Sequence, residues 1–372
     1  MSHAPRERLV DLIAGARPNF MKIAPLVAAL RAAAASGSTL RFRLVHTGQH
    51  YDHAMSGAFF AELGIPAPDV NLEVGSGTQA EQTALMMTRY ERLLAERKPD
   101  VCLVVGDVTS TMACAIVARK AHVPVAHVEA GIRSGDWTMP EEINRVVTDA
   151  ITNWFFTTSE TANGHLRRAG VGEERIFLVG NTMIDTLLAQ LPHLRPPALV
   201  EQLGLEPGRF LVLTLHRPAN VDDTGQLLAL LNAVSAARCG LPVIYPVHPR
   251  VEARLAALGA EGRPAGIEYV KPLGYREFTW LVKHARGVLT DSGGVTEEAT
   301  VLGVPCLTLR DSTERPETVE VGTNELIGTD AAAIAPALSR LHAGEWKKGG
   351  IPEHWDGHTA RRIVTLLERL LP

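Results

Sequence analysis

Acidic side chains follow two strongly apolar segments in the first half of the chain. Asp107 ends the segment DVCLVVGD, and Glu129 follows the apolar run VPVAHV. Carboxylates at the ends of buried strands cost free energy unless they are paired or solvated, which favours a chemical role for both. Capping of the following helix is an equal alternative for Asp107, because Asp is a favoured N-cap residue. Glu129 lacks that alternative, since a glycine and not a helix follows it closely.

A third acidic position lies in the segment MPEEINR. Pro140 indicates a helix start, where acidic residues suit the helix dipole, and Glu141 and Arg145 have the spacing of an ion pair on a helix surface. This pattern alone predicts a solvated helix face. Glu141 becomes a candidate for chemistry only if it shares a pocket with the two carboxylates described above.

Two cations surround the first predicted helix start, in the segment GARPNFMK. Arg17 and Lys22 would suit a pyrophosphate there, together with the free N–H groups of the first helical turn. A solvated pair of cations at a helix start is an alternative of at least equal weight. The segment lacks the pattern GxGxxG, so it does not predict a dinucleotide site.

Histidine and arginine occur together at two predicted strand ends in the second half of the chain. His216 and Arg217 follow one apolar run, and His248 and Arg250 follow the next. A single histidine is usually a satisfied polar group, but two such turns on successive strands that face one cleft favour a functional role. Arg315, in the segment DSTERPE, adds a cation after another strand.

The strongest local signal is the segment TDSGGVTEEA. Ser292, Gly293 and Gly294 stand between a predicted strand and a predicted helix. Glycines allow a close approach of the backbone to a phosphate, and the helix N-terminus supplies free N–H groups. One turn later, Glu297 or Glu298 has the acceptor oxygens that ribose hydroxyls need. A glycine turn capped by serine is the less favoured alternative.

The elements that would position these residues alternate between short apolar runs and longer amphipathic segments. This pattern predicts an α/β fold with two parallel sheets, and 372 residues are enough for two domains. Prolines interrupt the pattern between Gln190 and Arg209, which indicates a linker. We therefore predict an N-terminal domain at 1–188, completed by the C-terminal helix 357–372, and a second domain at 189–356.

Composition excludes several classes of protein. Hydrophobic residues make up 46% and charged residues 21%, as in ordinary globular proteins, and no apolar stretch is long enough to span a membrane. A net charge of −4 does not suggest a nucleic-acid partner. The four cysteines lie far apart and form no metal-binding pattern, so no metal is predicted. The N-terminus has no signal-peptide pattern, and we expect a cytoplasmic enzyme.

The chain resembles the non-hydrolysing UDP-N-acetylglucosamine 2-epimerase family from about residue 11 to residue 328. Seven segments in register carry the resemblance: GARPNFMK, TGQHYD, GDVTST, HVEAGIRSGDWTMPEEINR, LTLHRPANVDD, DSGGVTEEA and DSTERPE. The resemblance implies two Rossmann-like domains in the glycosyltransferase-B arrangement, with the active site between them. It also implies a UDP-sugar substrate, no cofactor and a homodimer.

The resemblance assigns roles to individual residues. The implied catalytic residues are the carboxylates Asp107, Glu129 and Glu141 and the polar residues Lys22 and His216. The implied nucleotide-binding residues are Arg17, His248, Ser292, Gly293, Gly294, Glu298 and Arg315, with Phe278 beside the uracil. Gln49 and His50 match an activating second UDP-GlcNAc site. Because Asp52 replaces a glutamine often found in that site, we do not expect activation in its usual form.

The implied reaction is reversible epimerisation at C2 of UDP-GlcNAc. Expulsion of UDP builds positive charge at C1 and acidifies C2, which gives a 2-acetamidoglucal, and UDP then adds back to give UDP-ManNAc. The carboxylates would serve as base, acid and stabiliser of the developing charge, in an order that the sequence leaves open. Alternatives are a 2-epimerase of UDP-2,3-diacetamido-glucuronate, a retaining UDP-sugar glycosyltransferase, a hydrolysing epimerase and, least favoured, a non-catalytic UDP-sugar sensor.

Overall fold

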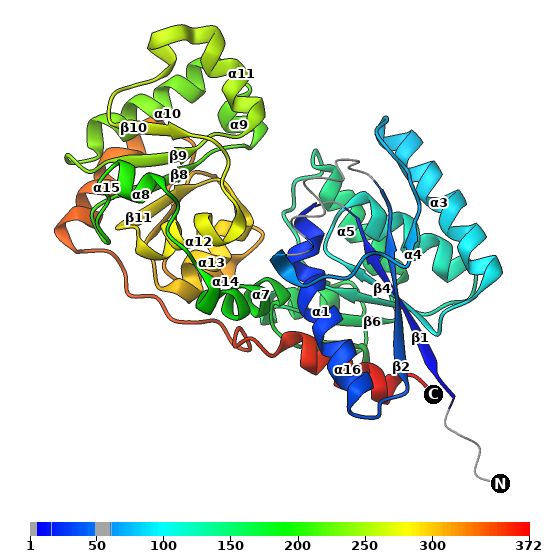
Figure 1. Cartoon of the computed structure of the whole chain (residues 1–372). Helices are drawn as coiled ribbons and strands as arrows, with labels where there is room; N and C mark the ends of the chain where they lie inside the picture. Colours follow the sequence, from blue (N-terminus) through cyan, green and yellow to red (C-terminus); the bar gives the residue numbers. More distant parts are fainter. Residues whose placement is uncertain (1–5, 16, 49–59, 61) are drawn as a thin grey trace. The chain divides into compact units, whose positions relative to one another are not determined.

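The protein divides into two compact units. A computed structural model describes residues 6–15, 17–48, 60 and 62–372, with the backbone alone described at 17, 18, 250, 260 and 261. Unit 1 comprises Met1–Leu188 and Glu353–Pro372, and unit 2 comprises Ala189–Pro352. Each unit is built around its own parallel sheet (Figure 1).

The described part of unit 1 contains a parallel sheet of seven strands in the order β3-β2-β1-β4-β5-β6-β7. Its strands are β1 (Arg8–Ala14), β2 (Leu40–His46), β3 (Val70–Asn71), β4 (Val101–Val105), β5 (Val125–Val128), β6 (Trp154–Thr157) and β7 (Ile176–Leu178). Every residue of β4 and β5 is buried, because helices cover both faces of the sheet.

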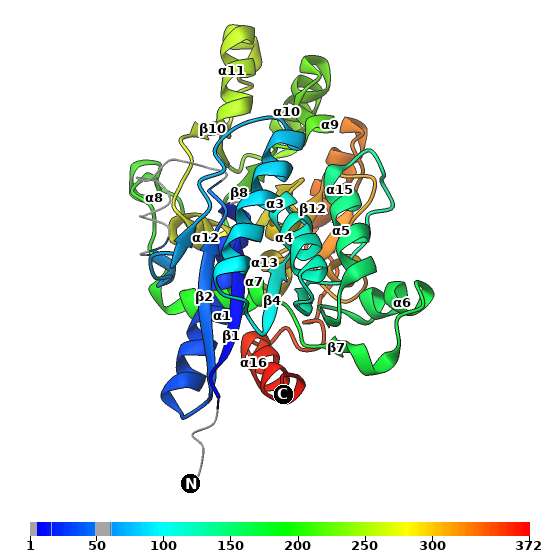
Figure 2. The same cartoon turned by 90° about the vertical axis from the view of Figure 1, so that its right-hand side faces the viewer.

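The helices of unit 1 pack in two layers. They are α1 (Arg17–Ala35), α3 (Gln79–Glu96), α4 (Thr109–Lys120), α5 (Pro140–Ile151), α6 (Glu160–Arg168), the short 3-10 helix η1 (Glu173–Arg175), α7 (Thr182–Gln190) and α16 (Thr359–Leu370). Helices α3, α4 and α5 lie side by side on one face, and α1 lies beside α16 (Figures 1 and 2).

The last helix is held in unit 1 by a carboxylate from another helix. Asp185 of α7 accepts hydrogen bonds from the backbone N–H groups of Thr359 and Ala360, at 3.1 and 2.7 Å, and so caps the start of α16. Trp355, just before α16, is buried, and its indole N–H donates to the carbonyl oxygen of Thr158. These contacts explain how a helix with no following strand joins the first unit.

The described part of unit 2 contains a parallel sheet of six strands in the order β10-β9-β8-β11-β12-β13. Its strands are β8 (Leu211–Thr214), β9 (Val243–Pro246), β10 (Ile267–Val270), β11 (Gly287–Thr290), β12 (Cys306–Thr308) and β13 (Asn324–Leu326). Its helices are η2 (Leu191–His193), α8 (Leu199–Gln202), α9 (Pro218–Val221), α10 (Thr224–Ala237), α11 (Pro249–Leu258), η3 (Gly259–Gly262), α12 (Tyr275–His284), α13 (Gly293–Leu302), α14 (Pro316–Glu320), η4 (Ala331–Ala333) and α15 (Ile334–Ala343).

The predicted fold class is confirmed, since both sheets are parallel and both have helical crossovers. The sequence pattern did not predict β3 or β13, which are short strands at sheet edges. Within the described ranges, no helix has the length and apolar character needed to cross a membrane.

The strand orders identify where ligands are expected in each unit. The chain leaves β1 and β4 toward opposite edges of the first sheet, and it leaves β8 and β11 in the same way in the second. Ligands of such sheets bind beyond the carboxyl ends of the strands at this switch point. Asp107 follows β4, His216 follows β8 and Ser292 follows β11.

Candidate functional site

Helix α1 and the carboxyl end of β5 bring a cation and a carboxylate together in unit 1. Lys22 of α1 places its Nζ atom 2.8 Å from Oε2 of Glu129, which directly follows β5. Glu129 is 4% exposed, and its backbone has the left-handed φ of 68° that is uncommon for a residue other than glycine. Such a conformation persists where surrounding contacts enforce it and is frequent at functional sites.

Asp107 is paired with a buried arginine instead of capping a helix. Its carboxylate forms an ion pair with Arg145 of α5, and its carbonyl oxygen accepts a hydrogen bond of 2.8 Å from Asn144. The N-cap of α4 is Val108, with no side-chain cap hydrogen bond. The capping alternative for Asp107 is therefore wrong.

Arg145 also corrects the expected pairing within α5. Its second guanidinium nitrogen lies 2.9 Å from Glu142, three residues earlier, and the expected pair with Glu141 does not form. The Glu142 carboxylate also accepts hydrogen bonds from the backbone of Ser134 and Gly135, at 2.9 and 3.1 Å. Burial alone would raise the pKa of Glu142, but these hydrogen bonds and Arg145 outweigh it and lower that pKa. Glu142 thus anchors the loop before α5.

Glu141 lies in the first turn of α5 and is partly exposed. Its side chain has no hydrogen bond or ion pair to another described residue. Because Asn144 and Arg145 tie the first turns of α5 to Asp107, Glu141 is at the same end of the sheet as the other two carboxylates. A position at the same end of the sheet is not yet a shared pocket, so the chemical role of Glu141 stays a prediction.

In unit 2, one buried carboxylate connects the turns after β8 and β11. Asp291, which is 0% exposed, accepts hydrogen bonds from the backbone N–H groups of His216 and Arg217 and from the side chain of Asn220. Its Oδ1 atom lies 2.9 Å from Nδ1 of His216. Burial raises the pKa of Asp291, but these contacts reverse the shift and lower it. Asp291 thus contacts one ring nitrogen of His216, Nδ1, and the other ring nitrogen, Nε2, lies farther from it.

The turn Ser292-Gly293-Gly294 has the features of a phosphate-binding turn. Helix α13 begins at Gly293, and the N-cap Ser292 makes no side-chain cap hydrogen bond, so the alternative of a serine-capped glycine turn is wrong. A Cβ atom added to Gly293 would meet no atom within 4 Å, which leaves open space beside the helix N-terminus. Free N–H groups there can bind an anion.

Two buried acids follow this turn and have different partners. Glu297 forms an ion pair with Arg315, which itself is 8% exposed. Glu298 accepts a hydrogen bond of 2.8 Å from the hydroxyl of Tyr275. Burial raises the pKa of Glu298 to about 7, the hydrogen bond opposes that effect, and the charge of Glu297 adds to it.

The other residues named from the sequence are placed as follows. His248 is exposed and stands just before α11, and Phe278 of α12 packs, partly buried, against the core of unit 2. The Arg17 side chain, Gln49 and His50 lie outside the described residues. Within the part of the chain that the structure describes, no group of three or more His, Cys, Asp or Glu side chains is placed to hold a metal ion.

The sequence pattern does not reveal the roles of Arg145 and Asp291. Spacing alone predicts a surface ion pair for Arg145 and no role for Asp291 beyond its turn. Each is less than 10% exposed and binds a residue that the sequence does identify. A charged residue within a mostly buried element is the signal that identifies such partners, because unpaired buried charges are costly.

The fold and these contacts define a class: two-unit Rossmann-like proteins with a phosphate-binding type of turn in one unit and paired carboxylates in the other. The family model described as "UDP-N-acetylglucosamine 2-epimerase" matches residues 32–368. The chain belongs to this family, as the resemblance predicted.

Individual relatives cover nearly the whole chain. A UDP-N-acetylglucosamine 2-epimerase of Methanocaldococcus jannaschii is 40% identical, over 96% of this chain and 98% of the relative. A solved structure of UDP-GlcNAc 2-epimerase from that organism, in complex with UDP-GlcNAc and UDP, has a TM-score of 0.85 and 39% identity and covers 97% of this chain and 99% of its own. A UDP-2,3-diacetamido-2,3-dideoxy-D-glucuronate 2-epimerase of Pseudomonas aeruginosa is 37% identical, over 96% of this chain and 99% of the relative.

Proposed function

We propose that the protein catalyses the reversible C2 epimerisation of UDP-GlcNAc and UDP-ManNAc without a cofactor. Family membership supports this substrate class, and the Lys22–Glu129 and Arg145–Asp107 pairs at the strand ends support the chemistry. The pairs are the observation that carries the proposal. Each cation balances the charge of a carboxylate that must work beside an anionic substrate.

The proposed reaction has two steps. The bond between C1 and the phosphate oxygen breaks, and its electron pair leaves with UDP. A carboxylate takes the C2 proton, and the C2–H electron pair forms the double bond of 2-acetamidoglucal. In the return step, C2 receives a proton on the opposite face and a phosphate oxygen of UDP bonds to C1. Asp107, Glu129 and Glu141 share the roles of base, acid and stabiliser of positive charge.

Unit 2 supplies the nucleotide contacts in this proposal. The Ser292 turn and the start of α13 bind the diphosphate, with Arg315 and His248 as further contacts, and His216 is a polar member of the catalytic site. Glu298 accepts hydrogen bonds from the ribose hydroxyls, and Phe278 packs beside the uracil. The Arg17 side chain is assigned to the same ligand by the resemblance alone.

The proposal is tested by NMR of the protein with UDP-GlcNAc and no acceptor. We expect UDP-ManNAc to appear and the total nucleotide sugar to stay constant. Release of free UDP and free sugar at the rate of turnover would identify a hydrolysing enzyme. Turnover only after an acceptor is added would identify a glycosyltransferase.

A second candidate substrate is UDP-2,3-diacetamido-glucuronate. The Pseudomonas relative that is named for this substrate is nearly as similar to the chain as the archaeal relative. Parallel incubations with the two UDP-sugars decide between the candidates, since the preferred substrate has the larger kcat/KM.

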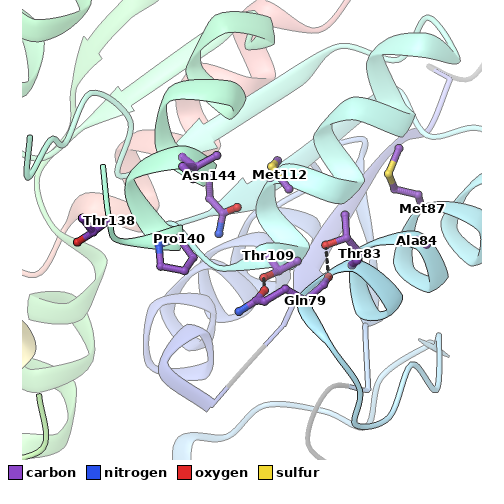
Figure 3. Close-up of a pocket in the computed structure, with 11 residues that line it drawn as sticks. Gln79, Thr83, Ala84, Met87, Thr109, Met112, Thr138, Pro140 and Asn144 are labelled. Atoms are coloured by element: carbon purple, nitrogen blue, oxygen red, sulfur yellow. Dashed lines mark hydrogen bonds between the residues drawn. The ribbon is translucent and has the colours of Figure 1, made fainter. Parts of the chain in front are cut away.

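We also propose a homodimer formed through α3, α4 and α5 of unit 1. A cavity of about 520 Å³ lies between these helices, lined by apolar side chains that include Met87, Met112 and Ile143 (Figure 3). Ile143 is 44% exposed, and Leu85 and Trp137, nearby in the chain, are also exposed. A second copy of the chain would bury this apolar surface.

Light scattering tests the dimer. We expect Ile143→Asp to halve the mass of the particle in solution. Val321→Asp in unit 2, where Val321 is also 44% exposed, is the matched control and should keep the dimer mass. A wild-type monomer, or a dimer that survives Ile143→Asp, would contradict this interface.

We further propose a cytoplasmic location. All four cysteines are free thiols, and Cys239 is exposed. Exposed thiols persist in reducing compartments. Cell fractionation tests this location.

A further inference from the structure

A buried histidine links two of the strands whose ends carry the carboxylates. His127 of β5 is 1% exposed, and its Nδ1 atom lies 2.8 Å from Oδ1 of Asp149 in α5. Its Nε2 atom lies 2.8 Å from the carbonyl oxygen of Gly106, which follows β4. Both partners are acceptors only. This arrangement therefore requires a proton on each ring nitrogen.

The second carboxylate oxygen of Asp149 has partners of its own. This Oδ2 atom accepts a hydrogen bond of 3.0 Å from the backbone N–H of Gly131 and lies 2.7 Å from Arg133. Burial raises the pKa of Asp149, but the hydrogen bond and charge of His127, together with Arg133, outweigh it and lower that pKa. The carboxylate is thus held between cations and a backbone donor.

The contacts of this network end beside the candidate catalytic residues. Gly106 directly precedes Asp107, and Gly131 lies two residues after Glu129. Gly106, Glu129 and Gly131 have φ values of 71°, 68° and 78°, so each strand ends in a left-handed bend. A residue other than glycine in this conformation costs about 1–3 kcal/mol, which surrounding contacts must offset.

We propose that His127 and Asp149 are positioning residues that hold the bends bearing Asp107 and Glu129 in their working geometry. This inference deepens the proposed function and rests on it. Neither side chain is expected to touch the substrate. Their loss should lower kcat about 10- to 100-fold, as is typical for partners that orient functional groups. UDP affinity, which the proposed function assigns mainly to unit 2, should stay unchanged.

The test compares two equally conservative substitutions. Asp149→Asn removes the charge that faces His127 and retains the side-chain shape. Asp11→Asn is the matched control: Asp11 is 0% exposed, lies within β1 of the same sheet, and binds Arg43 at 2.8 Å and Tyr90 at 3.0 Å. Both variants should lose stability. Only Asp149→Asn should lower kcat per UDP-binding site, and equal kcat values in the two variants would overturn the proposal.

Two further measurements keep the proposal testable if Asp149→Asn does not fold. Arg133→Gln removes a single, partly exposed partner of Asp149 and should lower kcat in the same direction, whereas unchanged kcat would count against the network. Nitrogen-15 NMR of the wild-type protein should show a hydrogen-bonded proton on each ring nitrogen of His127. A neutral ring would contradict the geometry from which the proposal is drawn.

Failure of the proposed function is distinguishable from failure of this inference. If the wild-type protein binds UDP but epimerises neither candidate sugar, the proposed function fails. Carboxyl carbon-13 resonances of Asp107 and Glu129 still report the positioning role in that case. They should shift in Asp149→Asn and not in Asp11→Asn, and equal spectra in the two variants would reject the role.

Discussion

Nζ of Lys22 lies 2.8 Å from Oε2 of Glu129, and the two residues are 107 positions apart in the chain. Both side chains are largely buried, at 14% and 2% exposure. The contact joins the first turns of α1 to the end of β5. It lies at the carboxyl ends of the strands, where ligands of such sheets bind. A buried pair at that position has the charge and the acid–base group that the proposed chemistry requires.

Removing only the lysine of this pair should lower the free energy of unfolding more than removing both charges. Lys22→Met leaves Glu129 buried beside an apolar group, which should lower the free energy of unfolding by about 3 kcal/mol. The double variant Lys22→Met/Glu129→Gln should recover part of that loss. Urea unfolding measures both, and a double variant less stable than Lys22→Met would contradict a paired role.

Asp107→Asn should keep the fold and abolish most of the activity. Val108 and not Asp107 caps α4, and asparagine can still accept a hydrogen bond from Arg145. We expect kcat to fall at least about 100-fold, as for loss of a general acid or base. Asp100→Asn, at the opposite end of β4, is the control and should keep kcat. Near-normal turnover by Asp107→Asn would remove Asp107 from the site.

Glu298 should make unfolding depend on pH between about 4.5 and 7. An unfolded glutamate loses its proton near pH 4.5, whereas the folded protein keeps it until pH rises to about 7. The folded state binds more protons in this window, so the free energy of unfolding falls as pH rises through it. Glu298→Gln removes this effect.

The Glu298→Gln variant should therefore gain stability relative to wild type as pH rises. The gain from about pH 4 to pH 8 should approach about 3 kcal/mol, the free-energy equivalent of the shift. Urea unfolding at the two pH values measures it. Glu277→Gln, in the first turn of α12, is the control. Parallel curves for wild type and Glu298→Gln would show that Glu298 titrates normally.

Asp291→Asn should weaken nucleotide binding without contact between Asp291 and the ligand. The amide nitrogen of asparagine would face N–H donors that now bind a carboxylate oxygen, which should loosen the His216 turn. We expect the Kd for UDP to rise about tenfold, equivalent to about 1.4 kcal/mol. Calorimetry measures it, with Asp223→Asn at the N-cap of α10 as the control. An unchanged Kd would separate Asp291 from the nucleotide site.

The sequence predicted the strands well because parallel strands covered on both faces are nearly continuous apolar runs. DVCLVVGD became β4 and the run before Ser292 became β11, with Asp107 and Ser292 two residues beyond the strand ends. The short strands β3 and β13 escaped prediction because two or three residues at a sheet edge carry no readable pattern.

The partners of the site residues were harder to predict than the residues themselves. Local spacing suggested a Glu141–Arg145 pair, but Arg145 turns inward to Glu142 and Asp107. The Asp149–His127 contact likewise joins a helix to a strand 22 residues earlier. Such pairings depend on how elements pack, and spacing along one helix does not contain that information.

In the proposed reaction, the C2–H bond of the sugar breaks and re-forms on this protein. Incubation with UDP-GlcNAc in deuterated water, followed by proton NMR, tests it most directly. We predict deuterium at C2 of both UDP-GlcNAc and UDP-ManNAc, together with loss of exchange in Asp107→Asn. Protein that binds UDP-GlcNAc and leaves the C2 proton unexchanged would contradict the account.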